Sequence, residues 1–350
     1  MGNKPLISVI MAVYNEEKYI EKSLHSILNQ TLQDFEIIIF DDCSTDKTVQ
    51  IINNIQDERI HLYKNSENQG LTKNLNQGLR LAQGQYIARM DGDDFSLPTR
   101  FEKQIDYFQH HPDVMLISCW AQDFGESMLR WKLRENSEEL KTRMLVKPVF
   151  AHPGFMMKKE LIEKGYFYDE SFRTAQDYEF ASRVAYQYEI GIVQEILLFY
   201  RVHKKQISNL AGKEQFSNAD RVREQLWNQV GVQLSDQEKK ELQCWAKEEQ
   251  LSSIEKYVNI NNLIYRISEA NKESGIYSQD TLERTLNRLL YIWVIHTRNI
   301  KLLLAFPKVC RYHRKNMILF VKELFGIIIE KFQNRGADGN ATAILKAENL

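Results

Sequence analysis

Cysteine is scarce in this sequence, and its placement excludes two common kinds of site. The 350 residues include four cysteines, Cys43, Cys119, Cys244 and Cys310, and no two of them form a Cys-x-x-Cys pair. This wide spacing argues against a zinc site and against a disulfide framework. We therefore expect reduced thiols.

Long apolar runs are also missing. A membrane-spanning helix needs about 18 apolar residues without a charge, and no stretch of the sequence provides them. The N-terminus leads directly into a strand-like run and lacks the architecture of a signal peptide. These absences predict a cytoplasmic protein.

A net charge of one sign is missing as well. The 46 basic and 47 acidic residues nearly cancel, so no global field favours a nucleic-acid partner. The C-terminal part differs, because basic residues greatly outnumber acidic ones between residues 288 and 335. With 43% hydrophobic residues, the chain can bury a large core and form one large domain and a smaller one.

The first part of the chain alternates between strand-like and helix-like patterns. Continuous apolar runs rich in β-branched residues are typical of strands buried on both faces. They occupy residues 6–13 and 35–40, further strands are predicted over 60–63 and 86–90, and helical periodicity lies between the strands. This order predicts an α/β fold with a doubly wound sheet.

Polar side chains follow these strands where ligands bind in such sheets. Tyr14 follows the first strand, Asp41 and Asp42 the second, and Asp91 and Asp93 the fourth. A nucleotide needs an aromatic wall, a carboxylate acceptor and a counter-charge for its phosphates, and these ends supply all three. A Gly-x-Gly-x-x-Gly loop and a P-loop are absent from the sequence, so a metal ion must meet the phosphate charge.

The turn at Asp91, Asp93 and Asp94 is the candidate metal site. Gly92 lets the backbone turn, so that Asp91 and Asp93 can offer hard oxygen ligands to one Mg²⁺ or Mn²⁺. The alternative is a solvated acidic turn that caps the helix expected after Pro98.

Two further candidates lie later in the chain. Asp177 is expected in the first turn of a helix, where it could act as a base or merely as a charge favoured by the helix dipole, as could Glu179. His203 follows a predicted strand over residues 190–202 and stands among cations.

Taken together, these segments closely resemble family 2 glycosyltransferases with the GT-A fold. The likeness spans residues 5 to about 208, and its segments occur in the family's order: residues 8–17, 26–31, 41–46, 91–94, 176–177 and 200–203. It implies an inverting enzyme of the surface-polysaccharide type that uses a UDP-sugar carrying a hexose or N-acetylhexosamine, a divalent cation (Mg²⁺ or Mn²⁺), and a glycan or lipid-linked acceptor. A GT-A sheet is mixed.

The resemblance also implies roles for individual residues. Ala12, Tyr14 and Asp42 would hold the uracil, with Glu16 also in the donor pocket. Asp91 would lie on the ribose or sugar side, and Asp93 would bind the metal. His203 would approach the diphosphate or metal, and Asp177 would be the base. Many members have Glu-Asp where this chain has Gln176 and Asp177.

The chemistry agrees with this reading. Inversion in one displacement needs one base for the acceptor hydroxyl, while a metal stabilises the leaving phosphate. A glycosidase would instead need a pair of carboxyl groups. The alternatives are a metal-dependent nucleotidyltransferase, although residues 12–17 include no glycine, and a non-catalytic nucleotide-binding module of the receiver type.

The rest of the chain is predicted to be helical. We expect a catalytic domain over residues 1–210, a helical region over 211–335 and a disordered tail over 336–350. Trp227, Trp245 and Tyr257 stand at helical spacing, which is typical of core residues. The apolar runs at 289–306 and 317–332 have basic flanks, which favours a peripheral contact with an anionic membrane on its inner face over a packed helical pair.

Overall fold

The structure is a computed structural model that describes residues 4–127, 129–203, 206, 212–249, 251 and 253–296. The chain forms two compact units. The first comprises residues 1–141 and 149–219, and the second comprises residues 142–148 and 220–350. The unit boundary therefore lies between Ala219 and Asp220, and a short segment from the middle of the chain belongs to the C-terminal unit.

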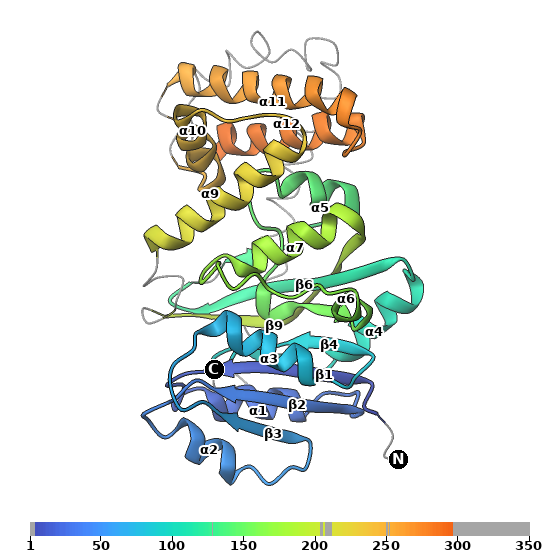
Figure 1. The fold of residues 1–350 in the computed structure, drawn as a ribbon, viewed down its shortest axis with the longest axis vertical. Coiled ribbons are helices and arrows are strands. Elements are labelled where there is room, and N and C mark those ends of the chain that lie inside the picture. The colour runs from blue at the N-terminus through green and yellow to red at the C-terminus, as the bar shows by residue number, and fades with distance from the viewer. Residues whose placement is uncertain are drawn as a thin grey trace. The chain divides into compact units, whose positions relative to one another are not determined.

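The first unit begins with the predicted alternation of strands and helices (Figure 1). Its elements are β1 (Ile7–Val13), α1 (Ile20–Leu28), β2 (Phe35–Asp41), α2 (Thr48–Asn54), β3 (Ile60–Lys64), α3 (Leu71–Leu81) and β4 (Tyr86–Arg89). β1 pairs in parallel with both β2 and β4, and β2 pairs in parallel with β3. The carboxyl ends of these four strands therefore lie at one edge of the sheet.

The remaining strands make the sheet mixed. They and their helices are β5 (Phe95–Ser96), α4 (Arg100–His110), β6 (Val114–Gly125), β7 (Arg130–Trp131), α5 (Ser137–Arg143), β8 (Met156–Lys158), α6 (Glu160–Glu163), α7 (Gln176–Gln187) and β9 (Glu189–Val202), with a short 3₁₀ turn at His152–Gly154. Within the described residues the sheet has nine strands in the order β3-β2-β1-β4-β8-β6-β9-β5, with β7 on β6. The predicted doubly wound mixed sheet is confirmed.

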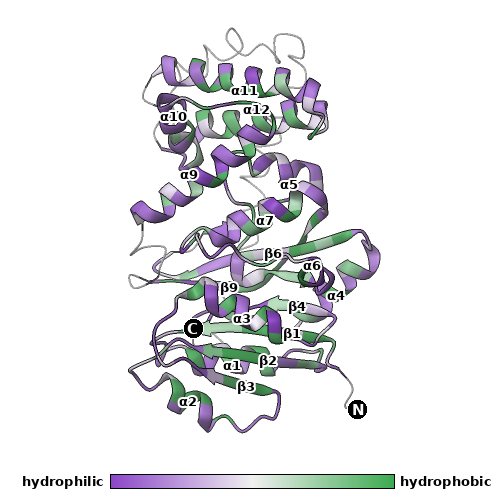
Figure 2. Ribbon diagram, in the orientation of Figure 1, coloured by the Kyte–Doolittle hydropathy of each residue, from purple (hydrophilic) through white to green (hydrophobic). Residues whose placement is uncertain are grey.

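Burial on both faces explains the apolar runs of β1 and β2, which are mainly hydrophobic in Figure 2. Alternate residues such as Val9 and Met11 belong to the same core cluster as Leu24 of α1. On the other face, a Cβ at Gly78 of α3 would lie 2.5 Å from Ile10 Cγ2, so only glycine permits this close approach. The two helices thus cover opposite faces of the sheet.

The second unit is helical, as predicted, and contains α10 (Asp236–Ala246), α11 (Ile254–Ser274) and α12 (Gln279–His296), together with the end of α9 (Gly212–Gln229). Ser235 and Glu238 form a capping box that begins α10. Trp227, Trp245 and Tyr257 are at most 2% exposed, which confirms the prediction that they are core residues.

The helical unit also bears on the predicted membrane contact. Leu290 and Trp293 of α12, at the start of the apolar run 289–306, are buried. Residues 297–306 of that run, the run at 317–332 and the expected disordered tail lie outside the described residues. Among the residues that the structure does describe, no helix has both the length and the apolar character that a bilayer-spanning segment requires.

Candidate active site

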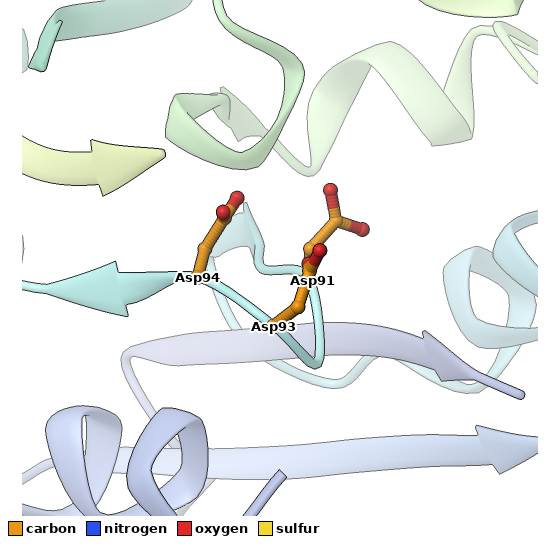
Figure 3. A group of neighbouring side chains, drawn as sticks. All are labelled: Asp91, Asp93 and Asp94. Carbon is orange, nitrogen blue, oxygen red and sulfur yellow. The ribbon is translucent and has the colours of Figure 1, made fainter. Parts of the chain in front are cut away.

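The acidic turn after β4 gathers three carboxylates. Asp91, Asp93 and Asp94 each offer an oxygen within 4.8 Å of the others, and Figure 3 shows the side chains projecting to the same side of the turn. Asp93 and Asp94 are 9% and 2% exposed. β5 separates this turn from α4, whose N-cap residue Thr99 makes no side-chain cap and whose Phe101 N–H donates to Gln30 Oε1. The alternative that the turn caps the following helix is therefore wrong.

Crowding changes the protonation of these carboxylates. Burial and the neighbouring Asp93 raise the pKa of Asp91 to about 6 despite the nearby Arg89 guanidinium. Burial, followed by the charges of Asp93 and Asp91, raises the pKa of Glu16 to about 8. Burial and the same two charges also raise the pKa of Asp94. Burial and mutual repulsion thus both disfavour the ionised forms of these carboxylates.

This donor set fits a hard divalent cation. Oxygen atoms are the ligands that Mg²⁺ and Mn²⁺ prefer. Asp94 Oδ2 is buried without a hydrogen-bond partner, although its Oδ1 accepts from the Arg201 backbone N–H at 2.7 Å. A buried carboxylate oxygen without a partner is costly, and a bound cation would satisfy it.

Strand β9 supplies the other wall of the cluster. His203 Nε2 lies 3.0 Å from Asp93 Oδ2, which brings together the two residues predicted as metal ligands. The Arg201 guanidinium donates to the Asp93 carbonyl at 2.7 Å and lies 4.2 Å from the centre of the Tyr19 ring. The turn is thus fixed from β9 through both backbone and side-chain contacts.

Arg89 is a site residue that the sequence prediction missed. Its side chain is 5% exposed and pairs with both carboxylate oxygens of Asp91. Its charge also opposes the rise that burial causes in the pKa of Asp177. A charged residue inside an otherwise apolar strand was the available signal, because such a residue is rarely buried without a partner.

Asp177 lies in the first turn of α7, as predicted. Ala175 immediately before the helix has φ of 57°, a left-handed conformation that alanine rarely adopts and that the surrounding structure must impose. Burial raises the pKa of Asp177. In contrast, Glu179 is bound by the Arg183 guanidinium at 2.7 Å, so its charge is paired within α7.

The predicted nucleotide-binding residues lie at the ends of β1 and β2. The register pairs Ala12 with Phe40 and Val13 with Asp41, so Tyr14 and Asp42 follow directly after the neighbouring ends of β1 and β2. Tyr14 is 48% exposed, whereas Asp42 is 3% exposed. The three residues therefore combine a small residue, an open aromatic ring and a fixed carboxylate.

Asp42 is held by the loop that leads into α3. Its carboxylate accepts from the Gln69 and Gly70 backbone N–H groups at 2.8 and 2.9 Å and from Asn65 Nδ2 at 2.9 Å. Although burial opposes it, these hydrogen bonds lower the pKa of Asp42. The Asn74 side chain donates to the same carboxylate, so four hydrogen bonds fix its orientation.

Comparison with known proteins agrees with this geometry. The family model described as glycosyl transferase family 2 matches residues 8–166. An uncharacterized glycosyltransferase of Methanocaldococcus jannaschii is 38% identical over 209 residues, which cover 57% of this chain and 72% of that protein. The O-antigen biosynthesis glycosyltransferase WbnJ of Escherichia coli is 34% identical over 209 residues, covering 57% of this chain and 81% of its own.

A solved structure shares the fold. Residues 1–349 of TarS from S. aureus, in complex with UDP-GlcNAc, superpose with a TM-score of 0.56 at 16% identity, covering 83% of this chain and 92% of that one. At this identity the similarity establishes the fold alone. The fold expected from the sequence, a GT-A sheet followed by a helical region, is thereby confirmed.

Proposed function

The chain belongs to glycosyl transferase family 2, and from this membership we propose that it is an inverting, metal-dependent enzyme that moves a hexose or N-acetylhexosamine from a UDP-sugar to an acceptor hydroxyl. The observation that carries the proposal is the meeting of the acidic turn, His203 and Asp177 beside the ends of β1 and β2. Surface-polysaccharide biosynthesis, with a glycan or lipid-linked acceptor, is the proposed setting, since WbnJ is named for O-antigen biosynthesis.

Each part of the donor has a candidate binding group. Ala12 and Tyr14 offer the uracil a small residue and an aromatic wall, and the fixed Asp42 carboxylate is proposed to accept from the uracil N3–H. Asp91, fixed by Arg89, is proposed to accept hydrogen bonds from ribose or sugar hydroxyls. Glu16, whose carboxyl group lies close enough to Asp91 and Asp93 for their charges to raise its pKa, is proposed to contact the donor as well.

Asp93 and His203 are the proposed metal ligands. A divalent cation bound there would neutralise the negative charge that develops on the departing diphosphate. The protein's own contribution is to hold the two side chains in contact, through β9 and the turn after β4. The Asp93 carboxylate suits both Mg²⁺ and Mn²⁺.

Asp177 is the proposed base. A base for inversion must take the proton of the acceptor hydroxyl while that oxygen attacks the anomeric carbon. Burial raises the pKa of Asp177 and so strengthens it as a base, while the Arg89 charge and the backbone N–H of Tyr178 favour its ionised form. A carboxylate in this balance can accept a proton and release it again.

The proposal is tested by measuring UDP release from UDP-glucose, UDP-galactose, UDP-N-acetylglucosamine and UDP-N-acetylgalactosamine. At least one of them should release UDP in the presence of Mn²⁺ or Mg²⁺, and a chelator should stop the reaction. A nucleotidyltransferase would instead release pyrophosphate from a nucleoside triphosphate. A non-catalytic nucleotide-binding module would bind UDP without turnover.

Asp42→Asn should weaken UDP binding about tenfold or more, because a hydrogen bond to a charged acceptor contributes roughly 1.5–3 kcal/mol. The amide keeps one oxygen for Gln69 and Asn65 but turns an N–H group toward Gly70 and the ligand. Isothermal titration calorimetry with UDP measures the effect. Asp57→Asn, in a surface ion pair with Arg59, is the control, and equal affinities for the two variants would remove Asp42 from the uracil site.

A membrane contact stays a proposal. It depends on the basic residues Arg311, Arg314 and Lys315, which lie outside the described residues. Each basic residue near an anionic surface contributes on the order of 1 kcal/mol and is weakened by salt.

A further inference from the structure

The hairpin of β6 and β7 carries a tryptophan that is both exposed and held in place. Trp131 retains 41% of its surface, while its indole Nε1–H donates to Asp123 Oδ1 at 2.8 Å. Asp123 is 4% exposed, and its Oδ2 accepts from Ser127 Oγ at 2.9 Å. A buried carboxylate therefore fixes the orientation of an exposed aromatic ring.

This arrangement has a cost for folding. Burying Asp123 removes a carboxylate from water, and burial accordingly raises its pKa. Leaving Trp131 partly exposed forgoes part of the free energy that burial of a large ring would contribute. Trp227, Trp245 and Trp293 are in contrast fully buried in the helical unit. A fixed and open ring is better explained by a ligand than by stability.

The sheet register places this ring beside the active site. β6 pairs Asp123 with Tyr200 of β9, and it pairs Ala121 with Trp131 of β7. Because paired residues and alternate residues of a strand share a face, Trp131, Asp123 and Tyr200 lie on the same side. The rings of Trp131 and Tyr200 have centroids 6.2 Å apart.

Tyr200 connects the ring to the acidic turn. Burial raises the pKa of the Tyr200 phenol, and the charges of Asp94, Asp91 and Asp93 raise it further. β5 pairs Phe95 with Phe199, so Asp94 and Tyr200 are the next residues along these antiparallel strands. Asp94, Tyr200 and Trp131 thus stand in a row that leads from the acidic turn to the exposed tryptophan ring.

We propose that Trp131, oriented by Asp123 and bordered by Tyr200, is a platform on which a pyranose ring of the acceptor stacks. This inference rests on the proposed function, and it names the acceptor class as a sugar. One face of a pyranose presents C–H groups that pack on an indole, while its hydroxyl groups can donate to nearby carboxylates. The uracil site is elsewhere, at the ends of β1 and β2, from which β4 and β8 separate β6 in the sheet.

Fluorine NMR tests the platform directly. The chain has five tryptophans, so labelling with 5-fluorotryptophan gives a small set of signals, and Trp131→Phe identifies the one from Trp131. The probes are methyl glycosides of glucose, galactose, N-acetylglucosamine and N-acetylgalactosamine, added to the full chain with UDP and Mn²⁺. At least one glycoside should shift the Trp131 signal saturably and leave the Trp227 and Trp245 signals in place.

Variants separate stacking from folding. Trp131→Ala should raise the dissociation constant of that glycoside about tenfold, the change expected for loss of a stacked ring. Tyr186→Ala, which removes another aromatic ring with 42% exposure, should not change it. Asp123→Ala should weaken binding about fivefold by releasing the ring, and Asp123→Asn should restore it, because the amide oxygen can still accept from the indole.

The outcomes distinguish the two proposals. If UDP binds and turnover occurs but no glycoside moves the Trp131 signal, the platform is wrong and the proposed function stands. If no UDP-sugar is hydrolysed while a glycoside still shifts the Trp131 signal, the sugar platform stands and the proposed transferase reaction is wrong. Equal glycoside affinities for Trp131→Ala and Tyr186→Ala would also overturn the platform.

Discussion

Asp93→Ala should abolish sugar transfer, with kcat lowered at least ~10³-fold, while the chain stays folded. A metal ion contributes several kcal/mol to the transition state of such a transfer, and each 1.36 kcal/mol changes a rate about tenfold. Asp93 contacts His203 at 3.0 Å, so its removal takes away one proposed ligand and releases the other. UDP release at saturating donor and Mn²⁺ measures the loss.

Folding should survive this change for an electrostatic reason. The Asp93 charge raises the pKa values of Glu16, Asp91 and Asp94, which means that the four groups repel one another when ionised. Removing one of them lowers that repulsion, so the metal-free variant should unfold at the same temperature as the native chain or a higher one.

Asp57→Ala is the matched control for Asp93→Ala, because it removes a carboxylate from a surface ion pair with Arg59 at 2.7 Å. Its turnover should equal that of the native chain. Near-normal turnover of Asp93→Ala in Mn²⁺ would show that the metal lies elsewhere. A chelator should reproduce the effect of the variant in the native chain.

The strands that carry the site were predictable because their physics is local. β1, β2 and β4 are buried on both faces, so their apolar runs are continuous and stop where a polar side chain meets the ligand edge. The parallel pairing of these strands then brings Asp42 and Asp91 to that same edge. The burial and parallel pairing of these strands therefore explain both the apolar pattern of the sequence and the position of the site.

Long-range pairing was not predictable in the same way. The position of β9 beside β5 and β6 places Arg201 against the acidic turn. There Arg201 donates to Asp93 and Asp94, which stand more than a hundred residues earlier in the chain. Residues 142–148 join the helical unit for a similarly non-local reason: the carbonyl of Leu145 accepts from the Trp227 indole N–H at 2.9 Å.

Backbone strain was also beyond local rules. Asn15, Cys43 and Ala175 have positive φ values, and they lie just after β1, just after β2 and just before α7. Cysteine and alanine do not favour that conformation, so tertiary contacts must impose it. Strained residues of this kind cluster at functional sites, and here they flank the predicted nucleotide residues and Asp177.

Asp177→Asn should lower kcat by roughly 10²- to 10⁴-fold, the contribution of a positioned base, while UDP affinity stays nearly unchanged. The amide has the same shape as the carboxylate but cannot take the acceptor's proton. In the native chain, turnover should rise with pH through the raised pKa of Asp177, because only the ionised form acts as a base. The variant should lose that limb of the pH profile.

The direction in which Asp177→Asn changes the stability of the chain can also be predicted. Because burial raises the pKa of Asp177 above 3.8, the folded state holds the proton more tightly than the unfolded state, and stability falls as pH rises from about that value through the folded pKa. The ionised side chain therefore costs stability at neutral pH. Asp177→Asn should unfold at a higher temperature than the native chain at neutral pH, and the difference should vanish in acid.

Glu179→Gln is the matched control, since Glu179 lies in the same first turn of α7 and its carboxylate is bound by Arg183. If Asp177 were merely a charge favoured by the helix dipole, the two variants would lose similar, small amounts of activity. As the base, Asp177 should account for nearly all of the loss, with Glu179→Gln close to native turnover. An equal loss of UDP binding in Asp177→Asn would place Asp177 in the donor pocket instead, and the base would then have to be sought among the other carboxylates around Arg89.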